Sequence, residues 1–86
     1  MNNTLCQDDH RYLGVLTNLV ESQKPEEGRH RCAGCAYTKG VDDGINGNVR
    51  NINVDDLPLS QAGTGRHKSC TDAYDLGYNH GVAQRP

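Results

Sequence analysis

RHRCAGCAYTKGVDDG, residues 29–44, and RHKSCTDAYDLGYNHG, residues 66–81, are two copies of one segment that align without a gap at an offset of 37. Six positions are identical, and Arg31 in the first copy is answered by Lys68 in the second. The agreement predicts two loop–helix units built on one framework and related by a pseudo-twofold axis. The identical pairs are Arg29 and Arg66, His30 and His67, Ala36 and Ala73, Tyr37 and Tyr74, Gly40 and Gly77, and Gly44 and Gly81.

Each copy carries the pattern Ala-x3-Gly-x3-Gly, which places three small residues along one stripe of a helix. Because a glycine inside a helix costs roughly 1 kcal/mol relative to alanine, its repeated use calls for a compensating reason. We expect Gly40 and Gly77 to permit close approach of two helix backbones, by analogy with the packing of small residues between membrane helices. Gly44 and Gly81 have two interpretations, the same packing or C-terminal capping.

The rest of the chain predicts a first helix and an irregular connector. The helix is expected from Thr4 to about Ser22, where a capping-box pattern precedes apolar residues at helical spacing. Turn signals make residues 45–65 an irregular connector, with one short strand around Val49, Ile52 and Val54. The predicted fold class is therefore mainly α: a single small three-helix domain over 1–86, with the first helix in 1–23 and the copies at 29–44 and 66–81.

The apolar content is too small for a large core. The 86 residues include 15 Leu, Ile and Val, four Tyr, and no Phe or Trp. That aliphatic share is about 17%, below the roughly 20% under which disorder becomes a concern. The net charge of −2 is too small to unfold the chain by repulsion. A domain of this size and composition needs an additional source of stability, which would be a metal ion, a disulfide or a second subunit.

Cysteine usage depends on the compartment. The sequence contains no apolar stretch long enough to span a membrane, and its N-terminus lacks the basic and then apolar run of a signal peptide. We therefore expect a cytoplasmic, reducing location. Closely spaced cysteines there bind metal or carry out redox chemistry more often than they form structural disulfides.

The spacing Cys32-x2-Cys35 is the strongest chemical signal in the chain. Two thiolates two residues apart can bend around one ion, as in zinc knuckles. A second pair, His67-x2-Cys70, occurs in the other copy. Three thiolates and one imidazole select zinc over hard cations, so these four residues form the predicted site, with one zinc ion per chain joining the two copies.

Three other residues compete for that site. His30 lies two residues before Cys32 and is an alternative to His67. Cys6 and His10 are four residues apart on the predicted first helix, a spacing that presents two ligands on one face. An all-cysteine site of Cys6, Cys32, Cys35 and Cys70 is the main rival. Cys6 has a second interpretation as a small buried hydrophobic residue.

These features predict a metal-stabilised interaction or regulatory module, with another protein or a second copy of the chain as partner. The alternative is nucleic-acid binding, in which Arg29, Arg31, Arg66 and Lys68 would contact phosphates from the two equivalent loops. That alternative needs these side chains on one exposed face, away from acidic groups. The mild net acidity already argues against non-specific nucleic-acid binding. The repeated Arg-His also has a structural interpretation. Its side chains could bond to the facing loop, or hold the N-terminus of the helix through contacts with the backbone.

Two enzymatic interpretations have weaker support, and we expect no catalytic activity. Redox motifs of the form Cys-x2-Cys follow a strand and open a helix, but no clear strand precedes Cys32. Hydrolytic metal enzymes use residues such as those of Asp8-Asp9-His10 and Asn79-His80. Their spacing here matches no motif.

Overall fold

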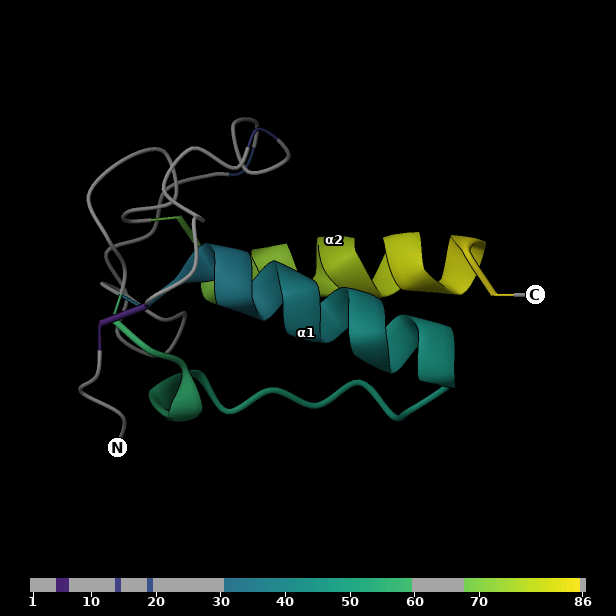
Figure 1. Cartoon of the computed structure of the whole chain (residues 1–86), viewed down its shortest axis with the longest axis horizontal. Coiled ribbons are helices and arrows are strands. Elements are labelled where there is room, and N and C mark those ends of the chain that lie inside the picture. Colours follow the sequence, from purple (N-terminus) through teal and green to yellow (C-terminus); the bar gives the residue numbers. More distant parts are fainter. Residues whose placement is uncertain (1–4, 7–13, 15–18, 20–30, 60–67, 86) are drawn as a thin grey trace.

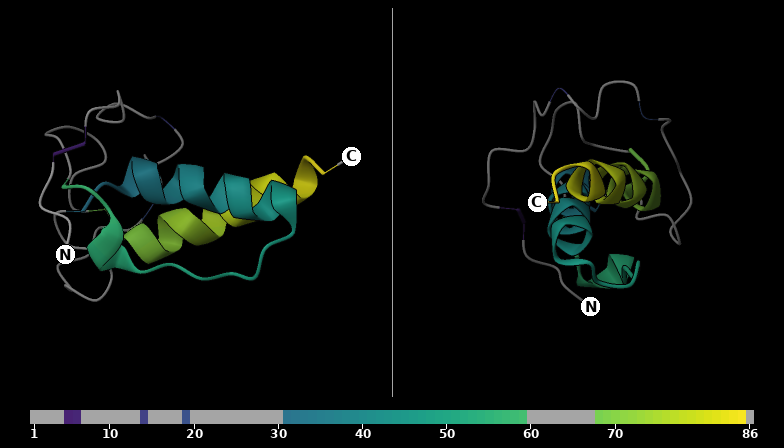
Figure 2. Two further views of the ribbon diagram at one scale, coloured as in Figure 1. Left: turned by 60° about the horizontal axis from the view of Figure 1, so that its bottom comes forward. Right: turned by 90° about the vertical axis from the view of Figure 1, so that its right-hand side faces the viewer.

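The computed structural model describes residues 5–6, 14, 19, 31–59 and 68–85, and this part is mainly helical. Helix α1 spans Ala33–Asn46, the short 3-10 helix η3 spans Val54–Asp56, and helix α2 spans Cys70–Ala83. Figure 1 shows α1 and α2 running in the same direction, with residues 47–59 returning along the pair. Both views of Figure 2 keep the two helices side by side. Within the described residues, β-pairing consists of isolated bridges.

The two α-helices begin in the same way. Each has 14 residues. The Cys32 side chain caps α1 by accepting a hydrogen bond from the Cys35 backbone N–H over 3.3 Å. Ser69, 37 positions later, caps α2 by accepting from the Asp72 N–H over 3.2 Å. In each helix the cap satisfies one of the backbone donors that the first turn leaves unpaired.

The glycines at the middle of each helix allow the backbones to touch. A Cβ atom on Gly40 would lie 2.2 Å from the carbonyl oxygen of Tyr74. A Cβ on Gly77 would lie 2.1 Å from the carbonyl oxygen of Tyr37, the equivalent residue of the other copy. Both distances are far below any real contact of a side-chain carbon. The predicted close approach at Gly40 and Gly77 is confirmed.

Gly44 and Gly81 continue this contact. A Cβ on Gly44 would lie 2.3 Å from the Tyr78 carbonyl oxygen, and one on Gly81 would lie 2.2 Å from that of Val41. Both glycines are buried within their helices, whereas α1 ends at Gly47, whose φ of 73° suits a glycine cap. The interpretation of Gly44 and Gly81 as caps is therefore wrong. Because no glycine side chain stands between the two backbones, the helices stay in contact along most of their length.

The connector after α1 covers one side of the pair without forming a strand. Leu57 is buried in the core with residues of both helices. Val49 is 85% exposed, and Val54 begins η3, so the strand predicted around Val49, Ile52 and Val54 is wrong. The physical reason is that backbone groups here bond to the helices, as when the Asn51 N–H donates to the Tyr74 hydroxyl over 3.0 Å. The core cluster comprises Ala33, Ala36, Leu57, Cys70, Ala73 and Tyr74.

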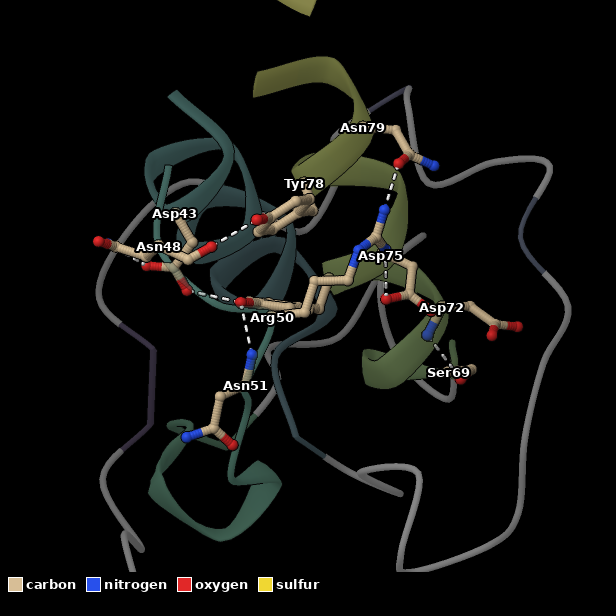
Figure 3. A network of polar contacts seen from close by, with 10 residues as sticks. Asp43, Asn48, Arg50, Asn51, Ser69, Asp72, Asp75, Tyr78 and Asn79 are labelled. Carbon is tan, nitrogen blue, oxygen red and sulfur yellow. Dashed lines mark hydrogen bonds and ion pairs between the residues drawn. The ribbon is translucent and has the colours of Figure 1, made fainter. Parts of the chain in front are cut away.

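A buried carboxylate fixes the start of the connector. The Tyr74 hydroxyl donates to Asp43 Oδ2 over 2.6 Å, and Asn48 Nδ2 donates to Asp43 Oδ1 over 3.1 Å. The Asn48 carbonyl in turn accepts from the Tyr78 hydroxyl (Figure 3). Because both helices and the connector contribute partners, this network holds the returning chain at the far end of the helix pair.

Arg50 ties the connector to α2 from the outside. Its guanidinium lies 4.3 Å from the centre of the Tyr78 ring and 3.0 Å from Asp75 Oδ1. It also donates to the side-chain oxygen of Asn79, as Figure 3 shows. The ion pair is exposed, so its expected contribution to stability is below about 1 kcal/mol.

The N-terminal segment meets the end of the connector. Leu5 forms a parallel bridge with Leu59, and Arg31 forms an antiparallel bridge with the same residue. Leu5 is therefore not helical, which corrects the predicted helix at its start, and Leu19 lies in a bend. Cys6 is not helical either. Gly14 apart, the rest of the predicted helix lies outside the described residues. None of the helices described is long and apolar enough to cross a membrane.

Candidate metal centre

Three cysteine sulfurs converge at the N-terminal end of the helix pair. The Sγ atoms of Cys6, Cys32 and Cys35 all lie within 4.8 Å of one another. The sulfurs of Cys6 and Cys35 are 3.5 Å apart, although 29 positions separate the two residues. Cys6 and Cys32 are buried, and Cys35 is partly exposed. No disulfide joins any of the three.

Two consecutive carbonyl groups bring these cysteines together. The Pro58 carbonyl oxygen accepts from the Cys32 N–H over 2.8 Å, and the Leu59 carbonyl accepts from the Cys6 N–H over 2.9 Å. The connector therefore holds the N-terminal segment and the entrance to α1 next to each other. Cys35 reaches the same place because it lies in the first turn of α1, three residues after the cap. The N-terminal segment, the cap of α1 and the first turn of α1 thus each contribute one cysteine to the cluster.

The electrostatics of the cluster favour a cation. A side-chain hydrogen bond with Cys32, burial, and the neighbouring Cys32 and Cys6 raise the pKa of the Cys35 thiol well above its ordinary value. Thiolates this close repel one another, so without a cation the group stays largely protonated. A bound metal ion reverses this, because a coordinated thiol is deprotonated outright.

The spacing of the sulfurs fits a tetrahedral ion. With zinc–sulfur bonds of roughly 2.3 Å, two sulfurs at tetrahedral positions lie roughly 3.8 Å apart. The separation of 3.5 Å between the sulfurs of Cys6 and Cys35, and the limit of 4.8 Å for all three, bracket this value. The three cysteines are thus close to the arrangement that such an ion needs.

Cys70, a predicted ligand, lies outside this group of three among the described residues. Its side chain is fully buried, and its Sγ atom is 3.5 Å from the Arg31 carbonyl oxygen, to which it donates. Burial, with a smaller contribution from the nearby Cys32 and opposition from Arg31, raises the pKa of Cys70 to about 12. Cys70 therefore has the properties of a core thiol in the first turn of α2.

The predicted ligand set and the observed cluster overlap at Cys32 and Cys35. Cys6, an alternative ligand in the sequence analysis, completes the observed group. The predicted ligand His67 and the alternatives His30 and His10 lie outside the described residues. Sequence spacing could not assign Cys6, because its position depends on the backbone bond to Leu59, a contact between distant segments.

The described basic residues of the two equivalent loops donate hydrogen bonds to backbone carbonyl oxygens. Arg31 is 8% exposed, and its guanidinium donates to the Leu57 carbonyl over 3.0 Å. Lys68, its counterpart, donates to the Leu19 carbonyl over 2.8 Å. Arg29 and Arg66 lie outside the described residues. Of the four residues predicted as phosphate contacts in the nucleic-acid alternative, the two that are described therefore have structural partners instead.

The residues of the hydrolytic interpretation are also engaged where they are described. The His80 Nδ1 atom lies 2.8 Å from the Tyr37 hydroxyl, and the two rings meet edge to face. Asn79 accepts from Arg50 on the surface of α2. Asp8, Asp9 and His10 lie outside the described residues. His80 is therefore a packing and hydrogen-bonding residue between the helices.

Comparison of the chain with protein-family models, with curated proteins and with solved structures gives no match in any of the three.

Proposed function

We propose that this protein is a small, non-enzymatic interaction module stabilised by one zinc ion, which Cys6, Cys32 and Cys35 bind as thiolates. The observation that carries the proposal is the convergence of three sulfurs within 4.8 Å from the N-terminal segment, the cap and the first turn of α1. Soft thiolate ligands favour zinc over hard cations such as magnesium. The fourth ligand is expected to be a histidine, with His67 as the first candidate and His30 and His10 as the others.

The ion would supply the stability that the core lacks. The buried core consists largely of alanine, cysteine and one tyrosine, with Leu57 as its sole large aliphatic residue among those described. A site of three thiolates would join the N-terminal segment to the start of α1. Without it, each of these two segments is held here by a single described backbone hydrogen bond. Structural zinc sites in small domains provide folding free energy directly, because the ligands do not form a site in the unfolded chain.

We also propose that the two loop–helix copies are related by a pseudo-twofold axis, with the N-terminal segment as a third element. The reciprocal contacts support this: Gly40 meets Tyr74 as Gly77 meets Tyr37. A thiol cluster at one end of such a pair is a structural arrangement, since ligation by several thiolates is typical of closed zinc sites. These features support a module and not a catalyst, in a reducing cytoplasmic setting where thiols persist.

The expected partner is another protein or a second copy of the chain. Ile45 and Val82, at equivalent positions near the ends of the two helices, are both exposed apolar residues. A nucleic-acid partner has less support, because two of the described cations are paired with acids: Lys39 with Asp43, and Arg50 with Asp75.

Native mass spectrometry of the protein purified without chelator tests the proposal. We expect one zinc ion per chain, and a sharp fall in the melting temperature when a chelator removes it. Structural zinc in small peptides contributes roughly 10–16 kcal/mol to apparent folding free energy, so the metal-free chain should be largely unfolded. A metal-free protein, or an unchanged melting curve in chelator, contradicts the proposal.

Serine variants identify the ligands. Cys32→Ser should lose zinc and yet retain a helix cap, because Ser69 performs that role at the equivalent position of α2. Cys6→Ser and Cys35→Ser should lose zinc as well. Cys70→Ser is the matched control and should keep it, since Cys70 lies outside the group. Loss of zinc in Cys70→Ser would instead make Cys70 the fourth ligand and exclude the histidines.

A further inference from the structure

We infer that the metal centre is redox-regulated: oxidation joins Cys6 to Cys35 in a reversible disulfide and expels the ion. This inference rests on the proposed function, because it assigns a regulation to the same three thiols. Its basis is the separation of 3.5 Å between the two sulfurs, which no disulfide joins. A disulfide has a sulfur–sulfur bond of about 2.05 Å, so small rotations of the two side chains would close the gap.

The third thiol is held differently. Cys32 Sγ accepts the backbone N–H of Cys35 over 3.3 Å, which engages it as the cap of α1. A bond between Cys32 and Cys35 would require Cys32 to give up this role. Cys6 lies on the N-terminal segment, where a backbone hydrogen bond to Leu59 positions it against Cys35. The Cys35 side chain hydrogen-bonds Cys32 as well, so the role of Cys32 as the cap of α1, and not a shorter distance, favours the pair from distant segments.

Access favours Cys35 as the residue that reacts first. Cys35 is partly exposed, whereas Cys6 and Cys32 are each 3% exposed. A small oxidant such as hydrogen peroxide would therefore meet Cys35 before the other two. Cys6 lies behind it, in position to resolve the oxidised sulfur.

The chemistry balances with one molecule of hydrogen peroxide. The Cys35 thiolate attacks the O–O bond, forming a sulfenic acid, and the departing hydroxide takes a proton to become water. The Cys6 sulfur then attacks the sulfenic sulfur, the S–S bond forms, and the second oxygen leaves as water. The two sulfurs supply two electrons, and a dithiol reductant returns them. The ion loses two thiolate ligands, which leaves Cys32 and the fourth ligand unable to retain it.

Replacing the zinc ion by a disulfide would keep the N-terminal segment linked to α1. Zinc and the disulfide both join Cys6 on the N-terminal segment to Cys35 on α1. The oxidised chain therefore keeps these two segments together. What changes is the loss of the ion and the release of Cys32. A partner that contacts this end of the helix pair would meet a different surface in each state.

The test uses the full chain loaded with zinc, and metal content is measured first. Hydrogen peroxide is then added, released zinc is followed with a metallochromic dye, and a non-reducing digest is mapped by mass spectrometry. We expect loss of the bound zinc, a chain lighter by two hydrogen atoms, and a linked peptide containing Cys6 and Cys35. A dithiol should reverse all three. Cys70→Ser should behave as the wild type, and Cys6→Ser should give no such peptide.

The outcomes separate the two claims. A chain that holds no zinc before oxidation contradicts the proposed function, and the regulated release with it. A chain that holds zinc but yields a Cys32–Cys35 link, or further oxidation of Cys35 without any link, overturns the inference alone. The mapping is done on the wild-type chain, so the conclusion does not depend on the folding of any variant.

Discussion

The two α-helices share a backbone framework and differ in the chemistry placed on it. α1 and α2 have the same length, the same kind of N-terminal cap and reciprocal glycine contacts. At the cap, α1 has Cys32 and α2 has Ser69. Three residues into the helix, α1 has Cys35 where α2 has Asp72. At these two positions α1 has thiols, whereas α2 has a hydroxyl and a carboxylate.

This difference shows which positions the framework constrains. The helix contact requires small residues at the glycines because main-chain atoms fill the space where a side chain would be. The cap requires only an acceptor for one N–H group, and sulfur and oxygen both provide it. Side-chain chemistry was therefore free to diverge at the caps and not at the glycines.

The largest effect is expected at the glycines of the shared contact. Gly40→Ala and Gly77→Ala place a carbon 2.2 Å and 2.1 Å from a backbone carbonyl oxygen, so the helices must separate. Each should destabilise the chain by about 3 kcal/mol, the upper end of the usual cost of overpacking. Denaturant unfolding measures this.

Gly14→Ala is the matched control for these variants. A Cβ at Gly14 would meet nothing within 4 Å, so the change should be close to neutral. Equal stability of Gly40→Ala, Gly77→Ala and Gly14→Ala would show that the helices do not touch through their glycines.

A smaller effect should distinguish two equivalent tyrosines. Tyr74 donates to the carboxylate of Asp43, whereas Tyr37 faces His80, the residue at the corresponding position. Hydrogen bonds to charged groups contribute about 1.5–3 kcal/mol, and neutral ones contribute about 1 kcal/mol. Tyr74→Phe should therefore destabilise the chain more than Tyr37→Phe at neutral pH, as measured by denaturant unfolding.

The acid dependence of stability should separate the two variants further. The hydrogen bond from Tyr74, and then that from Asn48, lower the pKa of Asp43 despite its burial. The ionised carboxylate thus stabilises the fold above the unfolded pKa of about 3.9, and this contribution is lost as the pH falls through the folded value. Unfolding midpoints measured from neutral to acid pH should fall less steeply in Tyr74→Phe than in Tyr37→Phe. Identical slopes would contradict the assigned role of Asp43.

Much of the helix pair is predictable from sequence because the repeat and the glycine stripe are local patterns. The Ala-x3-Gly-x3-Gly pattern, present in both copies, indicates the close approach at Gly40 and Gly77. Residues 44 and 81 are ambiguous in sequence because a glycine near a helix end serves either as a cap or as a contact. Only the partner helix, which fills the space beside each, decides between the two.

The metal centre is less predictable because one of its members comes from a distant segment. The spacing of Cys32 and Cys35 is local, and the sequence indicates that pair. Cys6 joins them because the Leu59 carbonyl binds its N–H next to the Pro58 carbonyl that binds Cys32. No periodicity or spacing encodes this meeting. Leu5 likewise has a helical pattern in sequence, but it pairs with Leu59 instead.

X-ray absorption spectroscopy at the zinc edge shows whether three thiolates of this chain bind one ion. We expect a first shell of three sulfurs at roughly 2.3 Å with one nitrogen ligand at roughly 2.0 Å. In Cys6→Ser that shell should lose sulfur or the ion altogether. A wild-type shell made of nitrogen and oxygen, with sulfur absent, would contradict the account.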